Sequence, residues 1–166
     1  MFKGNVLDIG YKNTGIVYNV YKHLNEEANI EYINGNDEKG NIKKGEYDSC
    51  ILLFSFSCML NNKAKEVLLD DIYSYLKKDG LLYIWDIDKG FGEIFNGTIK
   101  ILVPDRKIMK LKINNYNVLK NSSSNNAQKL IEKKFKLLTS ITSDKIYSIK
   151  AIKKEQKNEL KKSGRI

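Results

Sequence analysis

The sequence predicts an α/β protein whose central sheet is mostly parallel. Two observations carry this prediction. Short apolar runs typical of buried strands alternate with segments of helical periodicity, and their order of strand, helix, strand, strand, helix, strand is that of crossover units. The 166 residues are enough for one domain with a hydrophobic core. We expect residues 1–153 to form this domain and residues 154–166 to form a basic tail.

The first third of the chain supplies three of the expected strands and one helix. Residues 5–9 form a short apolar run. Apolar side chains then recur at helical spacing over residues 15–26, and residues 30–33 alternate between apolar and polar before an Asn-Gly turn. Residues 49–54 are almost continuously hydrophobic. Such a run predicts a central strand that is covered on both faces.

The rest of the chain supplies a long helix, a further parallel strand, a hairpin and an antiparallel closing unit. The hairpin is expected to turn at Pro104, because proline suits the first central position of a turn. We expect, in order, a helix over 62–78 that Gly80 caps, a strand over 81–86, an inserted hairpin over 98–113, a short helix from Ala127, and two antiparallel strands over 135–143 and 145–153.

The charge of the chain bears on its partners. The formal net charge is +9, which would suit a polyanion such as a nucleic acid. Only Arg106 and Arg165 among the 29 basic residues are arginine, however, and the abundance of Lys, Asn and Ile is typical of compositional bias. Nucleic-acid binding therefore stays an alternative, and a small-molecule partner is favoured.

Several classes of protein are not expected from the sequence. No apolar run is long enough to span a membrane, and the N-terminus lacks the pattern of a signal peptide, so we expect a cytoplasmic protein. Cys50 and Cys58 lie in apolar surroundings without a CxxC pair, which predicts free, buried thiols and no metal site. The single histidine, His23, is expected at the surface of the first helix.

Four segments together resemble class I S-adenosylmethionine-dependent methyltransferases, in the same order. They are Val6–Gly10, the strand around Tyr47–Ile51, the run Leu76–Ile84 and the closing two-strand unit, and the match covers residues 4–90 and 127–153. Within Leu76–Ile84, the segment Leu76–Gly80 is similar to the family's leucine-lysine-proline-glycine-glycine turn, with lysine and aspartate in place of proline and the first glycine. The resemblance implies a Rossmann-like methyltransferase fold and S-adenosylmethionine as the cofactor.

The family's first strand ends in a GxGxG loop, because only glycine lets the backbone approach the cofactor closely. Here Gly10 holds the first place, Lys12 and Thr14 hold the next two, and Gly15 comes one position late. The resemblance implies that Asp8 orients the methionine end of the cofactor; alternatively it caps the following helix. Lys12 would either pair with the cofactor's carboxylate or fill the pocket. The two glycines would also allow a tight turn with no cofactor present.

The family also places an acidic residue at the end of its second strand, where it binds the ribose. Counted from Gly10, Asn34 lies near that place; counted back from Tyr47, Gly35 and Asn36 match the pair that ends the family's third strand. We favour the second alignment, in which one strand-helix unit is missing and the sheet has one strand fewer than the family's seven. Asn36 and Asp37 would then lie near the adenine.

The acceptor side of the site follows the strand over 49–54. Phe54 and Ser55 are expected to line the cofactor pocket. The resemblance implies that Ser57 and Cys58 face the acceptor, and we expect the hairpin to shape that side. Asp86 and Asp88 end the strand over 81–86 on the ligand side. They would either contact an acceptor or a metal or be solvated loop carboxylates, and we favour the second interpretation. No catalytic residue is assigned. The sequence thus favours a methyltransferase acting on a small molecule; the alternative is a non-catalytic binding or scaffold module that has lost the cofactor.

Overall fold

The computed structural model describes residues 2, 4–11, 15–35, 42–103 and 107–155. Its main feature is a sheet with the strand order β2-β1-β3-β4-β8-β7. Strands β1 to β4 run parallel to one another, whereas β8 is antiparallel to both β4 and β7. The predicted α/β fold with an antiparallel edge is therefore confirmed. The strands are β1 (Val6–Gly10), β2 (Ile30–Asn34), β3 (Tyr47–Leu53), β4 (Leu76–Ile87), β7 (Phe135–Ser143) and β8 (Ile146–Lys153).

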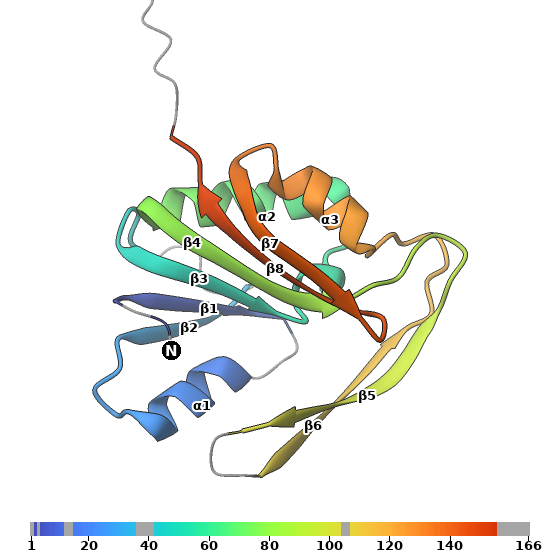
Figure 1. The fold of residues 1–166 in the computed structure, drawn as a ribbon, viewed down its shortest axis with the longest axis horizontal. Coiled ribbons are helices and arrows are strands. Elements are labelled where there is room, and N and C mark those ends of the chain that lie inside the picture. The colour runs from blue at the N-terminus through green and yellow to red at the C-terminus, as the bar shows by residue number, and fades with distance from the viewer. Residues whose placement is uncertain (1, 3, 12–14, 36–41, 104–106, 156–166) are drawn as a thin grey trace, which may run out of the picture.

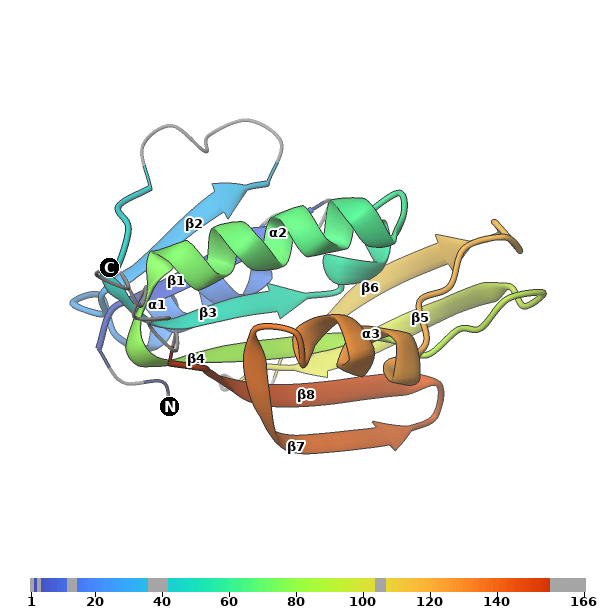
Figure 2. The ribbon, with the colours of Figure 1, turned by 90° about the horizontal axis from the view of Figure 1, so that it is seen from above.

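Helices cover both faces of this sheet (Figure 1). Helix α1 (Ile16–Leu24) lies on one face, and α2 (Asn62–Tyr75) and α3 (Ser124–Ile131) lie together on the other, as Figure 2 also shows. Successive side chains of a strand point to opposite faces. Leu7 accordingly belongs to the apolar cluster under α2 and α3, whereas Val6 belongs to the cluster under α1. Both side chains have no exposed surface, which explains why the central strands are apolar throughout.

The end of α2 differs from the sequence prediction. The helix ends at Tyr75, and Leu76 already pairs with β3 as the first residue of β4, so the two following lysines are not helical and Gly80 does not cap the helix. The register shifts before Leu81 resumes the pairing, and Asp79 takes a left-handed conformation with φ of 59°. Leu76 is fully buried. Burial of this side chain against the sheet therefore outweighs the helix propensity of the lysines.

Strand β2 lies directly beside β1, from Val6 opposite Ile30 to Gly10 opposite Asn34. In a doubly wound sheet this is the place of the strand that follows the first crossover. Strand β2 thus occupies the position of a second strand, and the alignment that made residues 30–33 the third strand is wrong. Asn34, not Asn36, is the residue beside Gly10. Within the described ranges the main sheet has six strands, the number expected, and β2 forms one of its edges.

The predicted hairpin is present as a separate two-stranded sheet of β5 (Phe95–Leu102) and β6 (Ile108–Asn115). The strands are antiparallel, with Thr98 opposite Lys112. The expected turn at Pro104 lies outside the described residues. Figures 1 and 2 show the hairpin beyond the ends of the parallel strands, where it stands apart from the main sheet.

Candidate functional site

A cavity of about 440 Å³ lies at the carboxyl ends of β1 and β3. Strands β2 and β3 flank β1 on opposite sides, so the order of the strands reverses here. Ligands of open α/β sheets bind at such switch points. Tyr11 and Phe54, the residues that follow β1 and β3, line one side together with Ser57 and Cys58, and residues 111–117 of the hairpin and its following loop line the other. We call this space the switch-point cavity.

The ends of β1 and β3 are tied together. The backbone N–H of Tyr11 donates to Oγ of Ser55 at 3.1 Å, and this hydroxyl donates to the carbonyl of Leu53 at 3.0 Å. Phe54 takes a left-handed conformation with φ of 50°, and its N–H donates to the carbonyl of Trp85 at 2.7 Å. The chain therefore turns sharply where it leaves β3, so that Ser55 lies beside the end of β1 while Phe54 is hydrogen-bonded to β4.

Tyr11 covers the end of β2, a feature that the sequence analysis missed. Its side chain is 7% exposed, and its hydroxyl donates to the carbonyl of Gly35 at 3.0 Å. A Cβ added to Gly35 would lie 1.9 Å from Cζ of Tyr11, so the ring packs directly on the glycine backbone. Because Asn34 immediately precedes Gly35, this ring lies beside the position at which the resemblance expects a ribose carboxylate.

Asp8 is a buried carboxylate within β1. Its Oδ2 accepts a hydrogen bond from the N–H of Tyr18 at 3.0 Å, which caps the first turn of α1, as one of the two interpretations of this residue proposed. Its Oδ1 has no hydrogen-bond partner among the described residues. Burial raises the pKa of Asp8 from 3.8 to about 6, and the Tyr18 hydrogen bond opposes that rise.

Asp86 is not the solvated carboxylate that the sequence predicted. Strand β4 extends to Ile87, so Asp86 lies inside the sheet and is fully buried. Its Oδ2 accepts from the N–H of Ser57 at 2.7 Å and its Oδ1 from the N–H of Ile87 at 2.7 Å. Burial raises the pKa of Asp86. The carboxylate therefore fixes the segment that carries Ser57 along the cavity.

Two buried lysines hold the loop that follows the hairpin. Lys89 is 1% exposed, and its Nζ donates to the carbonyls of Asn117 at 2.9 Å and Lys120 at 2.7 Å. Lys65, also 1% exposed, donates to the carbonyl of Asn121 at 2.8 Å. Burial lowers the pKa of Lys65 to about 8. Neither lysine was singled out from the sequence, because a lysine in a polar segment is usually exposed to solvent.

The structure places the expected site residues as follows. Gly10 is buried at the end of β1, and Gly15 has φ of 65° immediately before α1. Lys12, Asn36 and Asp37 lie outside the described residues. Cys58 was expected to be buried but is exposed, and it lines the switch-point cavity. His23 is exposed, as predicted.

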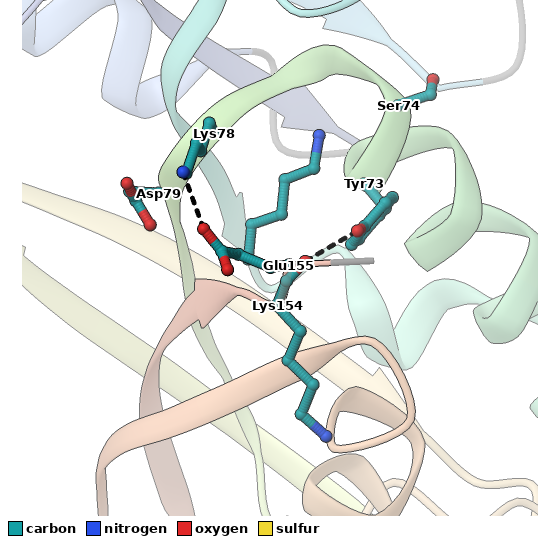
Figure 3. Close-up of a pocket in the computed structure, with 7 residues that line it drawn as sticks. Tyr73, Ser74, Lys78, Asp79, Lys154 and Glu155 are labelled. Carbon is teal, nitrogen blue, oxygen red and sulfur yellow. Dashed lines mark hydrogen bonds and ion pairs between the residues drawn. The ribbon is translucent and has the colours of Figure 1, made fainter. Parts of the chain in front are cut away.

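A larger hollow of about 590 Å³ lies at the opposite end of the sheet, where β4 begins and β8 ends (Figure 3). Several of its polar groups already have partners within the chain. Lys78 pairs with Glu155 at 2.7 Å, and the hydroxyl of Tyr73 donates to the carbonyl of Lys154 at 2.7 Å. This hollow lies at the amino ends of the parallel strands, away from the switch point, so we take the smaller cavity as the candidate site.

Within the described ranges, no three His, Cys, Asp or Glu side chains gather as a metal site would require. None of the described helices is both long and apolar enough to cross a bilayer.

Comparison with known proteins shows the fold. No protein-family model matches the chain, and no curated protein matches it in sequence. Among solved structures it is similar to PH0226 of Pyrococcus horikoshii (TM-score 0.57, 14% identity, 92% of this chain and 83% of that one). It is also similar to the 1,6-didemethyltoxoflavin-N1-methyltransferase of Burkholderia thailandensis (TM-score 0.57, 9% identity, 92% of this chain and 72% of that one). A third similar structure is the N-methyltransferase NodS of Bradyrhizobium japonicum (TM-score 0.57, 8% identity, 92% of this chain and 79% of that one). The chain thus has the Rossmann-like fold of S-adenosylmethionine-dependent methyltransferases.

Proposed function

We propose that this chain is an S-adenosylmethionine-dependent methyltransferase that acts on a small molecule. The observation that supports this best is the switch-point cavity, because it lies at the ligand-binding end of the fold and is closed on its far side by the hairpin. Two proteins of similar fold, the Burkholderia enzyme and NodS, were crystallised with S-adenosylhomocysteine.

The residues around Asp8 fit the methionine end of the cofactor. The unpartnered Oδ1 of Asp8 is an acceptor suited to an ammonium group. Helix α1 begins beside it after Gly15, and a helix N-terminus favours a carboxylate. In this proposal Asp8 and the N-terminus of α1 bind the amino-acid part of the cofactor, and Gly10 lets it approach the backbone of β1.

The end of β2 fits the ribose less well. Asn34 is a neutral side chain where a carboxylate would accept hydrogen bonds from the ribose, and the Tyr11 ring lies over the neighbouring Gly35. Loss of one charge-assisted hydrogen bond costs about 1.5–3 kcal/mol, which is roughly tenfold to a hundredfold in affinity. We therefore expect weak cofactor binding.

When bound, the cofactor supplies a sulfonium methyl group that a nucleophile displaces in line, so catalysis depends largely on proximity and orientation. In this proposal the protein's part is to hold the acceptor. Ser57, whose N–H is fixed by Asp86, and Cys58 lie on one side of the acceptor, and the hairpin excludes water on the other.

A second candidate is a binding module that has the fold without the cofactor. One observation favours it: the packing of Tyr11 on Gly35 fills space beside the end of β2 with the protein's own side chain. In such a module the switch-point cavity would bind a small molecule with no chemistry following.

Calorimetry with S-adenosylhomocysteine separates the two candidates. We expect weak binding to the natural chain, loss of binding in Asp8→Asn, and no change in Asp70→Asn, whose carboxylate lies on α2 and pairs with Lys134. Lys12→Ala should weaken binding if that lysine pairs with the cofactor's carboxylate, whereas Lys12→Gly should strengthen binding if the lysine fills the pocket. No heat at millimolar ligand from the natural chain or from either Lys12 variant would favour the binding module.

A further inference from the structure

The wall of the switch-point cavity that the hairpin and its loop supply is basic. Lys112 of β6 and Lys120 of the following loop line it, together with the polar residues Asn114, Asn115, Tyr116 and Asn117. None of the described residues that line the cavity is acidic. The remaining lining is largely apolar, with Phe54 and Leu60 on one side and Leu111 and Ile113 on the other.

The loop that carries Lys120 is held by hydrogen bonds from the ammonium groups of two buried lysines. Lys89 donates to the carbonyl of Lys120 itself and Lys65 to that of the next residue, Asn121. Buried donors of this kind hold a backbone segment firmly, because releasing it would leave an ammonium group unpaired away from water. The part of the basic wall that carries Lys120 is therefore held in place by the body of the protein.

Three carboxylates at the end of β4 and in the segment after it do not line the cavity. Asp86 accepts from the N–H groups of Ser57 and Ile87, Asp88 accepts from the N–H of Ser124 at 2.8 Å, and Glu93 accepts from the N–H of Gly90. Each of these carboxylates thus accepts from backbone N–H groups and is not itself part of the lining. A ligand in the cavity meets cations and amides first.

We propose that the switch-point cavity binds a small organic anion, a phosphate or carboxylate group on an apolar body. Lys112 and Lys120 bind the anionic group as point charges, the amides of β6 complete its hydrogen bonds, and the apolar lining takes the body. This inference rests on the proposed function in one respect, namely that the anion is the methyl acceptor. Binding of the anion itself needs no cofactor.

The test is a titration of the ¹⁵N-labelled full chain, without cofactor, with phenyl phosphate, benzoate, benzyl alcohol and benzylamine. These probes share one ring and differ in the charged group. We expect the two anions to shift the amide signals of Ser57, Cys58 and Asn115, the alcohol to bind at least fivefold more weakly, and the amine not to bind. The tighter of the two anions identifies the group as phosphate or carboxylate.

Variants of β6 locate the site. Lys112→Gln should weaken anion binding about fivefold to tenfold, the size expected for one charge-assisted hydrogen bond at an exposed side chain. Lys110→Gln is the matched control, since Lys110 is exposed on the same strand and does not line the cavity. Equal binding of benzylamine and phenyl phosphate, or equal weakening by both variants, would overturn the inference.

The outcome for the anion and that for the methyltransferase proposal can be told apart. Anion binding at Ser57 and Asn115 without any binding of S-adenosylhomocysteine would uphold this inference and refute the methyltransferase. Binding of S-adenosylhomocysteine without discrimination between phenyl phosphate and benzylamine would do the reverse.

Discussion

The ring of Tyr11 lies directly on Gly35, with its hydroxyl 3.0 Å from the carbonyl of that glycine. The contact joins the ends of β1 and β2 at the carboxyl end of the parallel strands. It requires a glycine at position 35, because an added Cβ would lie 1.9 Å from the ring. The glycine after β2 thus provides the surface on which the Tyr11 ring packs. Tyr11 also lines the switch-point cavity.

Gly35→Ala should therefore destabilise the fold by about 1–3 kcal/mol, the usual cost of forcing extra volume into a packed site. Urea unfolding followed by circular dichroism measures this. Gly90→Ala is the control, since the nearest atom to its added Cβ is 3.9 Å away, and it should change stability by about 0.5 kcal/mol or less. Equal costs for the two substitutions would contradict the described contact.

Asp8→Asn should stabilise the protein at neutral pH. Folding raises the pKa of the Asp8 carboxyl group from 3.8 to about 6. The protonated carboxyl group therefore stabilises the fold below pH 4, and this stabilisation is lost as the pH rises through 6. Removing the charge should restore about 2–3 kcal/mol at pH 7.5 and nothing at pH 4. Thermal unfolding at both pH values tests this, and a gain that does not depend on pH would contradict the role of burial.

Much of the fold follows from the sequence, because its apolar patterns are strong. The continuous run over residues 49–54 predicted a central strand, and β3 indeed lies between β1 and β4. The end of α2 could not be predicted, since Leu76 suits a helix as well as a strand and only its pairing with β3 decides. Asp86 was misplaced for the same reason, because the strand runs past it to Ile87.

The site was less predictable than the fold. Phe54, Ser57 and Cys58 were placed near a ligand from their position after β3, and they line the cavity. Cys58 was expected to be buried because its neighbours are apolar, yet the turn at Phe54 starts a short 3₁₀ helix that exposes it. Tyr11 and Lys89 act through contacts with residues distant in sequence, at positions 35 and 117–120, which no local pattern indicates.

The turn between β7 and β8 can be improved. Asp144 and Lys145 both have positive φ, 51° and 60°, as the two central residues of a type I′ turn require. Lys145→Gly should stabilise the protein by about 0.5–1 kcal/mol, because glycine takes this conformation without strain. The same substitution at Ser148, within β8, should instead lower stability. A loss of stability on Lys145→Gly would mean that the turn has another conformation.

Lys89→Met should loosen the loop behind the cavity. The substitution keeps the length of the side chain and removes the donor to the carbonyls of Asn117 and Lys120, at a cost of about 1–3 kcal/mol. Amide hydrogen exchange should accelerate in residues 117–121 more than in β8. Lys110→Met, at an exposed site, should leave both stability and exchange unchanged. Uniform acceleration across the chain would show that Lys89 supports the fold in general and not this loop.

The most direct test of the account is to map where S-adenosylhomocysteine binds. In a titration of the ¹⁵N-labelled chain at up to millimolar ligand, the account predicts shifts in the amide signals of Gly10, Tyr18 and Phe54, at the ends of β1 and β3 and the start of α1. The signals of Tyr73 and Glu155, in the hollow at the opposite end, should not move. Absence of shifts at the first three residues, or shifts confined to the opposite hollow, would contradict the proposal that this chain binds the methyltransferase cofactor.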